Sequence, residues 1–270
     1  MSASITTYLK DLSYSYYLKK SSDEIAKINT SKTNLLNNLN SALGYRIKRS
    51  FVFGSYDRDT ILPRSVDSNS DIDVMVIFNH TEYERTPETY RNWLKTFADN
   101  NYKSRYGSDV VKSFPTVTIR LGNIHFDLVP AKEETWGWSS SNIYIPDKSY
   151  GWQSTDPSDV KTRLTDANTR FNQIVKPIIR LLKAWNSTKG YPFDSYELEL
   201  AITDMNFSGD NIESGFFYAV NSLPSSWRDP QTKQDKINSL RYNIENVKNC
   251  LARYDINSAK SWLHRVLPYA

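Results

Sequence analysis

An apolar strand that begins with two alternating acids constrains this chain more than any other feature. Residues 71–78 read Asp-Ile-Asp-Val-Met-Val-Ile-Phe. Because residues two apart on a strand point to the same face, Asp71 and Asp73 should project side by side while Ile72 and Val74 pack behind them. Neighbouring carboxylates repel each other unless a cation lies between them. The pattern therefore predicts a sheet strand whose first residues hold a metal ion.

A third carboxylate lies in another apolar segment. Asp127 is flanked by Phe126 and Leu128, and an unpaired charge among apolar residues is costly. If this segment is a strand beside residues 71–78, three carboxylates converge. Hard divalent cations prefer carboxylate oxygens and substrate phosphates. We therefore expect two Mg²⁺ ions, for which Mn²⁺ can substitute, at a two-metal phosphoryl-transfer site held by Asp71, Asp73 and Asp127.

A Gly-Ser pair completes the predicted site. Gly54 and Ser55 directly follow a strand predicted at residues 46–53. A glycine at a strand-to-helix turn permits close backbone approach, and the amide and hydroxyl groups there can hold a phosphate. A lone Gly-Ser is usually a turn and a lone Asp-x-Asp is usually a strand end. The three features in this order favour a catalytic interpretation.

The remaining pattern predicts an α+β protein with a mixed front half and a helical back half. Apolar residues at helical spacing predict a helix at 21–44, and a Thr-Pro start predicts another from 86 to about 103. Strands are expected at 114–121 and 123–129, where they would form a hairpin. Residues 133–159 are expected to form an irregular connection. Further helices are predicted at 160–189, 195–206, 211–222 and 231–267. We expect a catalytic core with its long N-terminal helix at 1–150, and a helical nucleotide-binding half at 151–270.

Composition excludes several other classes of protein. A net charge of +4 favours anionic substrates only weakly. The single cysteine, Cys250, rules out an internal disulfide and a cysteine-rich zinc site. No apolar run is long enough to predict a membrane span, and residues 1–10 lack the apolar core of a signal peptide. A cytoplasmic location with no membrane partner is expected.

The order Gly54-Ser55, Asp71-Ile72-Asp73 and Asp127 resembles the DNA polymerase β-like nucleotidyltransferase superfamily. The resemblance implies a mixed sheet with helices, a helical C-terminal half, and an active site in the cleft between them. The 15 residues between Ser55 and Asp71 are a longer separation than the family pattern predicts. Asp59 stands near the position where many members carry a glycine.

The second half resembles the CD-NTases, the bacterial relatives of cyclic GMP–AMP synthase and oligoadenylate synthase. The similarity lies in residues 171–185 and 193–199, with support from residues 151–157 and Asn168. It implies that Ser55, Lys183 and Ser195 contact the triphosphate and that Tyr196 stacks on the base. From the residues alone, two alternatives stay open. The stripe of Lys176, Arg180 and Lys183 could be solvated surface, and Tyr196 could be a core tyrosine.

The resemblance implies template-independent nucleotidyl transfer from ATP or other NTPs, which yields a cyclic or linear oligonucleotide. That product would be a second messenger, read by a separate effector protein in bacterial anti-phage (CBASS) signalling. One alternative is addition of nucleotides to RNA or tRNA ends, for which basic residues of the C-terminal half would follow the backbone. Nucleic acid is expected as a partner only in that case. A further alternative is a non-catalytic nucleotide-binding protein on the same fold.

Overall fold

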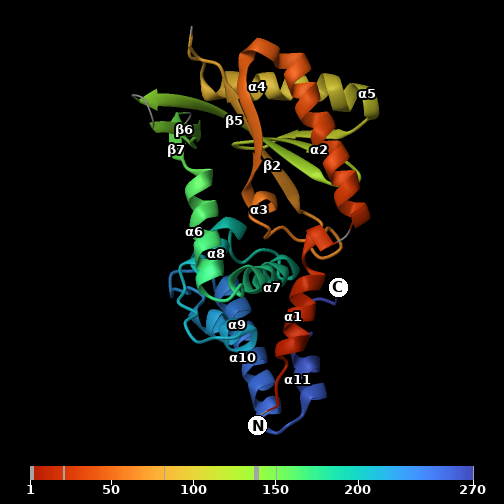
Figure 1. Ribbon diagram of the computed structural model, residues 1–270, viewed down its shortest axis with the longest axis vertical. Coiled ribbons are helices and arrows are strands. Elements are labelled where there is room, and N and C mark those ends of the chain that lie inside the picture. Colours follow the sequence, from red (N-terminus) through yellow and green to blue (C-terminus); the bar gives the residue numbers. More distant parts are fainter. Residues whose placement is uncertain (1–2, 21, 82, 137–139, 150, 270) are drawn as a thin grey trace. The chain divides into compact units, whose positions relative to one another are not determined.

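The chain forms two compact units, drawn in Figure 1. The computed structural model describes residues 3–20, 22–81, 83–136, 140–149 and 151–269. The sheet unit consists of Ser21–Arg58 and Asn69–Asp159, and the helical unit consists of Met1–Lys20, Asp59–Ser68 and Val160–Ala270. These bounds differ from a single division after residue 150, because two segments of the front half cluster with the C-terminal helices.

Among the described residues of the sheet unit, seven strands make up its framework. They are β1 (Ile47–Phe53), β2 (Asp71–Phe78), β3 (Asp109–Lys112), β4 (Val117–Arg120), β5 (His125–Trp136), β6 (Ser140–Pro146) and β7 (Trp152–Thr155). The main order is β1-β2-β5-β4-β3, and β6 pairs with β5 and β7. β2 and β5 run parallel, while the other neighbours are antiparallel. A mixed sheet of this kind confirms the α+β prediction.

The strands predicted at 46–53 and 71–78, and the hairpin at 114–129, are confirmed. The irregular connection predicted for 133–159 is wrong, because its described residues include the end of β5, β6 and β7. Residues 143–145 read Ile-Tyr-Ile, a β-favouring run whose signal is diluted by the surrounding serines, glycine and tryptophans. Pairing with Glu133 and Thr155 places Ile143 inside a ladder, which local sequence does not reveal.

Helices cover one face of this sheet. They are α2 (Ser22–Leu43), α4 (Pro87–Ala98) and α5 (Ser104–Tyr106), and a wider helical turn at Asp99–Lys103 joins the last two. Two short turns flank β1: Gly44–Arg46 form a 3₁₀ turn before it, and α3 (Gly54–Asp57) is a single helical turn after it. Thr86 caps α4 by accepting the Thr89 amide at 3.3 Å. Tyr90 of α4 stacks on Phe78 of β2, with 4.5 Å between ring centroids. α4 therefore covers the face opposite the one that carries Asp71 and Asp73.

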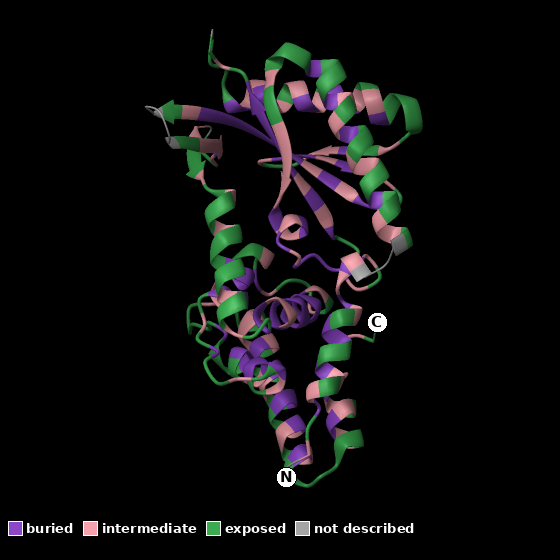
Figure 2. Cartoon of the chain, in the orientation of Figure 1, coloured by how far each residue is buried: buried purple, intermediate pink, exposed green. Residues whose placement is uncertain are grey.

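The helical unit is built around α7 (Val175–Thr188), most of whose residues are buried and are coloured purple in Figure 2. The other helices are α1 (Thr6–Ser15), α6 (Pro157–Arg170), α8 (Ser195–Thr203), α9 (Ile212–Ser222), α10 (Gln231–Ala252) and α11 (Ile256–Leu263), with a 3₁₀ turn at Leu18–Lys20. α1 was not predicted from the sequence. It buries Leu9 and Leu12 in the same core as Trp185 of α7.

Two predicted long helices are each broken, so the continuous helices at 160–189 and 231–267 are wrong. After α6, Asn172 and Gln173 take φ values of +52° and +63°. The Gln173 amide donates to the Asn168 carbonyl at 2.7 Å, which closes the turn. Pro177 lies in the first turn of α7, where its missing N–H is tolerated, and it marks the break in the sequence. Within the described residues, no helix is both long and apolar enough to cross a membrane.

Candidate active site

Strand register brings the three predicted aspartates to one face of the sheet unit. β2 and β5 pair in parallel with Asp71 opposite His125 and Asp73 opposite Asp127. Because directly paired residues of neighbouring strands point to the same face, both aspartates of β2 share a face with Asp127. The sequence suggests that the three aspartates are close together, but their proximity depends on the pairing of two strands that are about 50 residues apart in the chain.

The same face changes from acidic to apolar along the strands. After Asp73, Met75 and Ile77 lie opposite Val129 and Ala131, and these four side chains form a buried cluster. The alternate residues of β2, which are Ile72, Val74, Val76 and Phe78, are fully buried on the other face. Carboxylates at the strand's start are therefore held on a rigid base that is apolar on both sides.

Gly54 leaves the space that the Asp73 carboxylate fills. A Cβ atom at Gly54 would lie 1.8 Å from Asp73 Oδ2, far inside van der Waals contact. Gly54 also has φ of +73°, a conformation that glycine adopts without strain. It begins α3, which ends with the Arg58 amide donating to the Gly54 carbonyl at 3.1 Å. The predicted Gly-Ser turn is thus packed directly against the predicted Asp-x-Asp strand.

Asp127 has neighbours on β4 that the sequence analysis missed. The Thr118 hydroxyl donates to Asp127 Oδ1 at 2.5 Å, and Thr118 is the residue paired with Asp127 across β4 and β5. Burial raises the pKa of Asp127 above its ordinary value, although hydrogen bonds from Thr118 and Thr116 and the charge of His125 oppose the rise. The alternation Thr-Val-Thr-Ile at 116–119 was the available signal, since it places both threonines on one face.

The donor types and their strand positions fit hard divalent cations, but the side chains are not gathered for coordination. No three His, Cys, Asp or Glu groups among the described residues lie close enough to hold a metal ion. The Asp73 carboxylate lies against Gly54, the residue that follows β1. The Asp127 carboxylate is instead directed toward Thr118 on β4, which lies on the side of β5 opposite β2. Rotation of these side chains on their fixed strands is what a shared ion would require.

The predicted base and phosphate contacts of the helical unit lie at the start of α8. The Asp194 carboxylate caps this helix by accepting the amides of Tyr196 and Glu197 at 2.9 and 3.0 Å. Tyr196 is 46% exposed, so the alternative of a core tyrosine is wrong. Ser195 is the first residue of α8 and is half-buried. Their contacts with a nucleotide stay predictions.

The basic stripe of α7 is not a solvated surface. Arg180 and Lys183 are both buried. Arg180 donates to the carbonyls of Ser13 and Asp59, at 3.0 and 3.1 Å, and burial lowers its pKa to about 10. Lys183 lies 3.7 Å from the buried carboxylate of Glu199. Arg180 therefore stabilises the helical unit through these hydrogen bonds, and the side chain of Lys183 lies inside the same unit.

Residues 59–68, the segment between the Gly-Ser turn and β2, are anchored inside the helical unit. The Asp59 carboxylate pairs with Lys19 at 2.6 Å and with Lys176 at 3.1 Å, and these contacts hold its pKa below the ordinary value despite burial. Its φ is +66°, a left-handed backbone conformation that glycine adopts more readily than aspartate does. Farther along, the Tyr191 hydroxyl donates to Asp67 at 2.5 Å.

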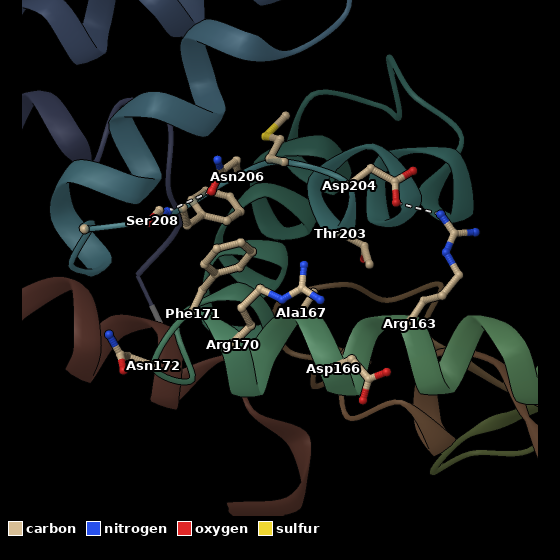
Figure 3. A pocket seen from close by; sticks show the side chains of 13 residues that line it. Arg163, Asp166, Ala167, Arg170, Phe171, Asn172, Thr203, Asp204, Asn206 and Ser208 are labelled. Carbon is tan, nitrogen blue, oxygen red and sulfur yellow. Dashed lines mark hydrogen bonds and ion pairs between the residues drawn. The ribbon is translucent and has the colours of Figure 1, made fainter.

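A cavity of about 810 Å³ in the helical unit contains none of the predicted site residues. Figure 3 shows it between the end of α6 and the turn after α8, with Arg163 paired to Asp204 at 2.6 Å. Arg170 and Asp166 also line it. The cavity is polar but carries no residue of the predicted chemistry.

A family model and a curated sequence match this chain. The model for the Second Messenger Oligonucleotide or Dinucleotide Synthetase domain matches residues 3–168. A protein of Bacillus cereus strain VD146 named as a probable cyclic nucleotide synthase is 33% identical over 130 residues. That match covers 44% of this chain and 39% of the Bacillus protein, so well under half of the relative's length is represented.

Solved structures share the fold over nearly the whole chain. The CD-NTase CdnG of Bradyrhizobium diazoefficiens, in complex with GTP, has a TM-score of 0.69 at 11% identity and covers 97% of this chain and 98% of its own. CdnC of E. coli MS115-1, with ATP, has a TM-score of 0.68 at 14% identity over 98% and 97% of the two chains. At such low identity the likeness establishes the fold.

Proposed function

The chain belongs to the family of second messenger oligonucleotide or dinucleotide synthetases, and on that premise we propose that it joins NTPs into a cyclic or linear oligonucleotide. One structural observation carries the proposal. Asp73 and Asp127 are register partners on neighbouring parallel strands, Asp71 shares their face, and Gly54 packs against the Asp73 carboxylate. A broken acidic set would instead favour a non-catalytic protein, and this set is intact.

In the proposed reaction, a hydroxyl of one nucleotide attacks the α-phosphate of another and releases pyrophosphate. We assign binding of Mg²⁺, or of Mn²⁺ in its place, to Asp71, Asp73 and Asp127. When bound, such ions would supply positive charge to the phosphate oxygens and to the attacking hydroxyl. Asp127 would accept the proton of that hydroxyl as a general base, and its carboxylate already accepts a hydrogen bond from the Thr118 hydroxyl.

The triphosphate contacts are assigned to groups of several segments. Ser55 follows the glycine that abuts Asp73, so its hydroxyl and the amides of that turn are suited to phosphate oxygens. Lys183 is a compact positive charge suited to the same oxygens, and Ser195 is a second hydroxyl donor. Tyr196 exposes a ring on which any base could stack. These roles follow family resemblance and the chemistry of each side chain.

Addition of nucleotides to RNA ends is the weaker alternative. It would use the basic residues of the C-terminal half, but two of these already contact acidic groups there. Lys233 pairs with Asp229 at 3.1 Å and Lys248 with Glu245 at 3.4 Å. A surface with paired charges attracts a phosphate backbone less strongly than an uncompensated one. The family match also favours a second messenger over RNA.

The proposed biological setting is cytoplasmic anti-phage signalling, in which a separate effector protein reads the product. This part rests on the family alone.

The test is an assay of the purified protein with each labelled NTP, singly and in mixtures, with Mg²⁺ or Mn²⁺. Phosphatase-resistant label that forms without RNA, and that is lost in Asp71→Ala/Asp73→Ala, is the expected result. Product that forms only when RNA is added would overturn the proposal in favour of the alternative. Full product formation by the double variant would remove the assigned metal site.

A further inference from the structure

Lys183, to which the proposed function assigns a contact with phosphate, forms a buried ion pair with Glu199 in the helical unit. Lys183 Nζ lies 3.7 Å from Glu199 Oε2, and the two side chains are only 9% and 2% exposed. Charges so removed from water require a counter-charge, and removing one partner of such a pair is strongly destabilising. The pair is therefore a structural requirement of the unit when no nucleotide is present.

The carboxylate of this pair is fixed in place by a third segment. The Thr60 hydroxyl, fully buried, donates to the same Oε2 atom at 2.8 Å. Thr60 lies in the segment between the Gly-Ser turn and β2, Lys183 lies on α7, and Glu199 lies on α8 one turn after Ser195. Glu199 thus joins three segments that each adjoin or carry a predicted site residue.

The lysine, by contrast, is held only loosely. A separation of 3.7 Å is too long for a hydrogen bond, so the attraction is one of charge alone. Among the described residues, the Lys183 side chain makes this ion pair and no hydrogen bond. Its ammonium group therefore keeps N–H donors for a better acceptor. Oxygens of a triphosphate offer both the negative charge and the hydrogen-bond geometry that Glu199 does not.

We propose that Glu199 is a positioning residue that serves as the resting counter-ion of Lys183, and that nucleotide binding exchanges this carboxylate for a phosphate oxygen. The inference rests on the proposed function, in which Lys183 binds the triphosphate. Glu199 then opposes binding, since its charge competes for Lys183. Uncharged ligands, such as nucleosides, cannot displace it, whereas a triphosphate can. Glu199 would thus set both nucleotide affinity and selectivity for the triphosphate.

The test uses Glu199→Gln, which keeps the shape of the side chain and an oxygen for Thr60 but removes the charge. Binding of a non-hydrolysable ATP analogue is measured by calorimetry with Mg²⁺, and the Tm is measured with and without the analogue. GTP, CTP and UTP analogues are used in parallel. We expect a lower Tm without nucleotide, a larger nucleotide-induced rise in Tm, and a Kd about tenfold lower than in the wild type.

Glu197→Gln is the matched control, because it removes the same charge from an exposed position two residues earlier on α8. Its Kd should stay within about twofold of the wild type. The double variant Lys183→Met/Glu199→Gln removes both charges, so its Tm should exceed that of Glu199→Gln, and the gain in affinity should vanish. These two results tie the effect to the pair rather than to α8.

An unchanged or higher Kd in Glu199→Gln, with wild-type binding intact, would overturn the exchange while leaving the proposed function in place. No binding of any NTP analogue by the wild type would instead overturn the proposed function. If Glu199→Gln is too unstable to assay, the comparison of Tm with the double variant still decides. A double variant no more stable than Glu199→Gln would rule out Glu199 as the counter-ion.

Discussion

The Asp73 carboxylate lies in the space that any side chain at Gly54 would occupy. A Cβ atom there would come within 1.8 Å of Asp73 Oδ2. A side chain at Gly54 therefore cannot be accommodated unless Asp73 moves, so the Gly-Ser turn and the Asp-x-Asp strand act as one structural element. This relationship gives the first prediction.

Gly54→Ala should lower turnover by about tenfold or more, because the displaced Asp73 carboxylate can no longer reach an ion that it shares with Asp127. The unfolding free energy should fall by about 1–3 kcal/mol from overpacking and backbone strain. Gly107→Ala is the control: its φ of +67° matches the +73° of Gly54, but its Cβ would meet nothing within 4 Å. Product assays and urea unfolding compare the two. Equal losses of turnover in both variants would show that backbone strain alone is responsible.

Asp127→Asn should stabilise the protein when no metal is present. Burial raises the pKa of Asp127, so the ionised form that exists at neutral pH is the one that folding disfavours. In EDTA the variant should therefore have a higher Tm than the wild type, and Mg²⁺ should raise the Tm of the variant less than that of the wild type. Turnover should fall at least about a hundredfold. Asp109→Asn, at an exposed carboxylate on β3, should change none of these. A lower Tm for Asp127→Asn in EDTA would contradict the argument.

Glu133→Gln should lower the free energy of unfolding at neutral pH but not in acid. Hydrogen bonds from Arg49 and Lys48 lower the pKa of Glu133 from 4.5 to about 2. A lowered folded-state pKa gives stability that is present above pH 4.5 and is lost as the pH falls toward 2. The deficit at pH 7 should be about 1–2 kcal/mol, because both basic partners are half exposed. Denaturant unfolding at several pH values measures it. A deficit that stays constant down to pH 3 would show that charge is not its cause.

Arg180→Met should destabilise the helical unit by about 2–4 kcal/mol. The substitution leaves the carbonyl oxygens of Ser13 and Asp59 without their buried donor, while the volume is largely kept. Arg163→Met is the control, since its ion pair with Asp204 joins side chains that are 45% and 60% exposed. That variant should lose less than about 1 kcal/mol. Similar losses in the two variants, measured by urea unfolding, would mean that burial of Arg180 does not matter.

Local sequence pattern predicted strands β1 and β2 well because their signal is short in range. The alternation at 71–78 sets both the strand and its two faces, and Gly54 marks the preceding turn. The same approach failed at residues 171–174, where a helical pattern of apolar residues continues through a break. There, a closing hydrogen bond from Gln173 to Asn168 and the ring of Pro177 override the periodicity.

The sequence by itself determined which residues could carry the chemistry, since strand periodicity and residue type are local properties. Tertiary structure decided their partners: Asp127 with Thr118, Asp73 with Gly54, and Lys183 with Glu199. Each of these contacts joins segments that are distant along the chain or depends on the register between strands. The burial of Lys183 likewise depends on what packs around α7. Pairing and burial are set by the free energy of the whole fold, so periodicity within one segment cannot reveal them.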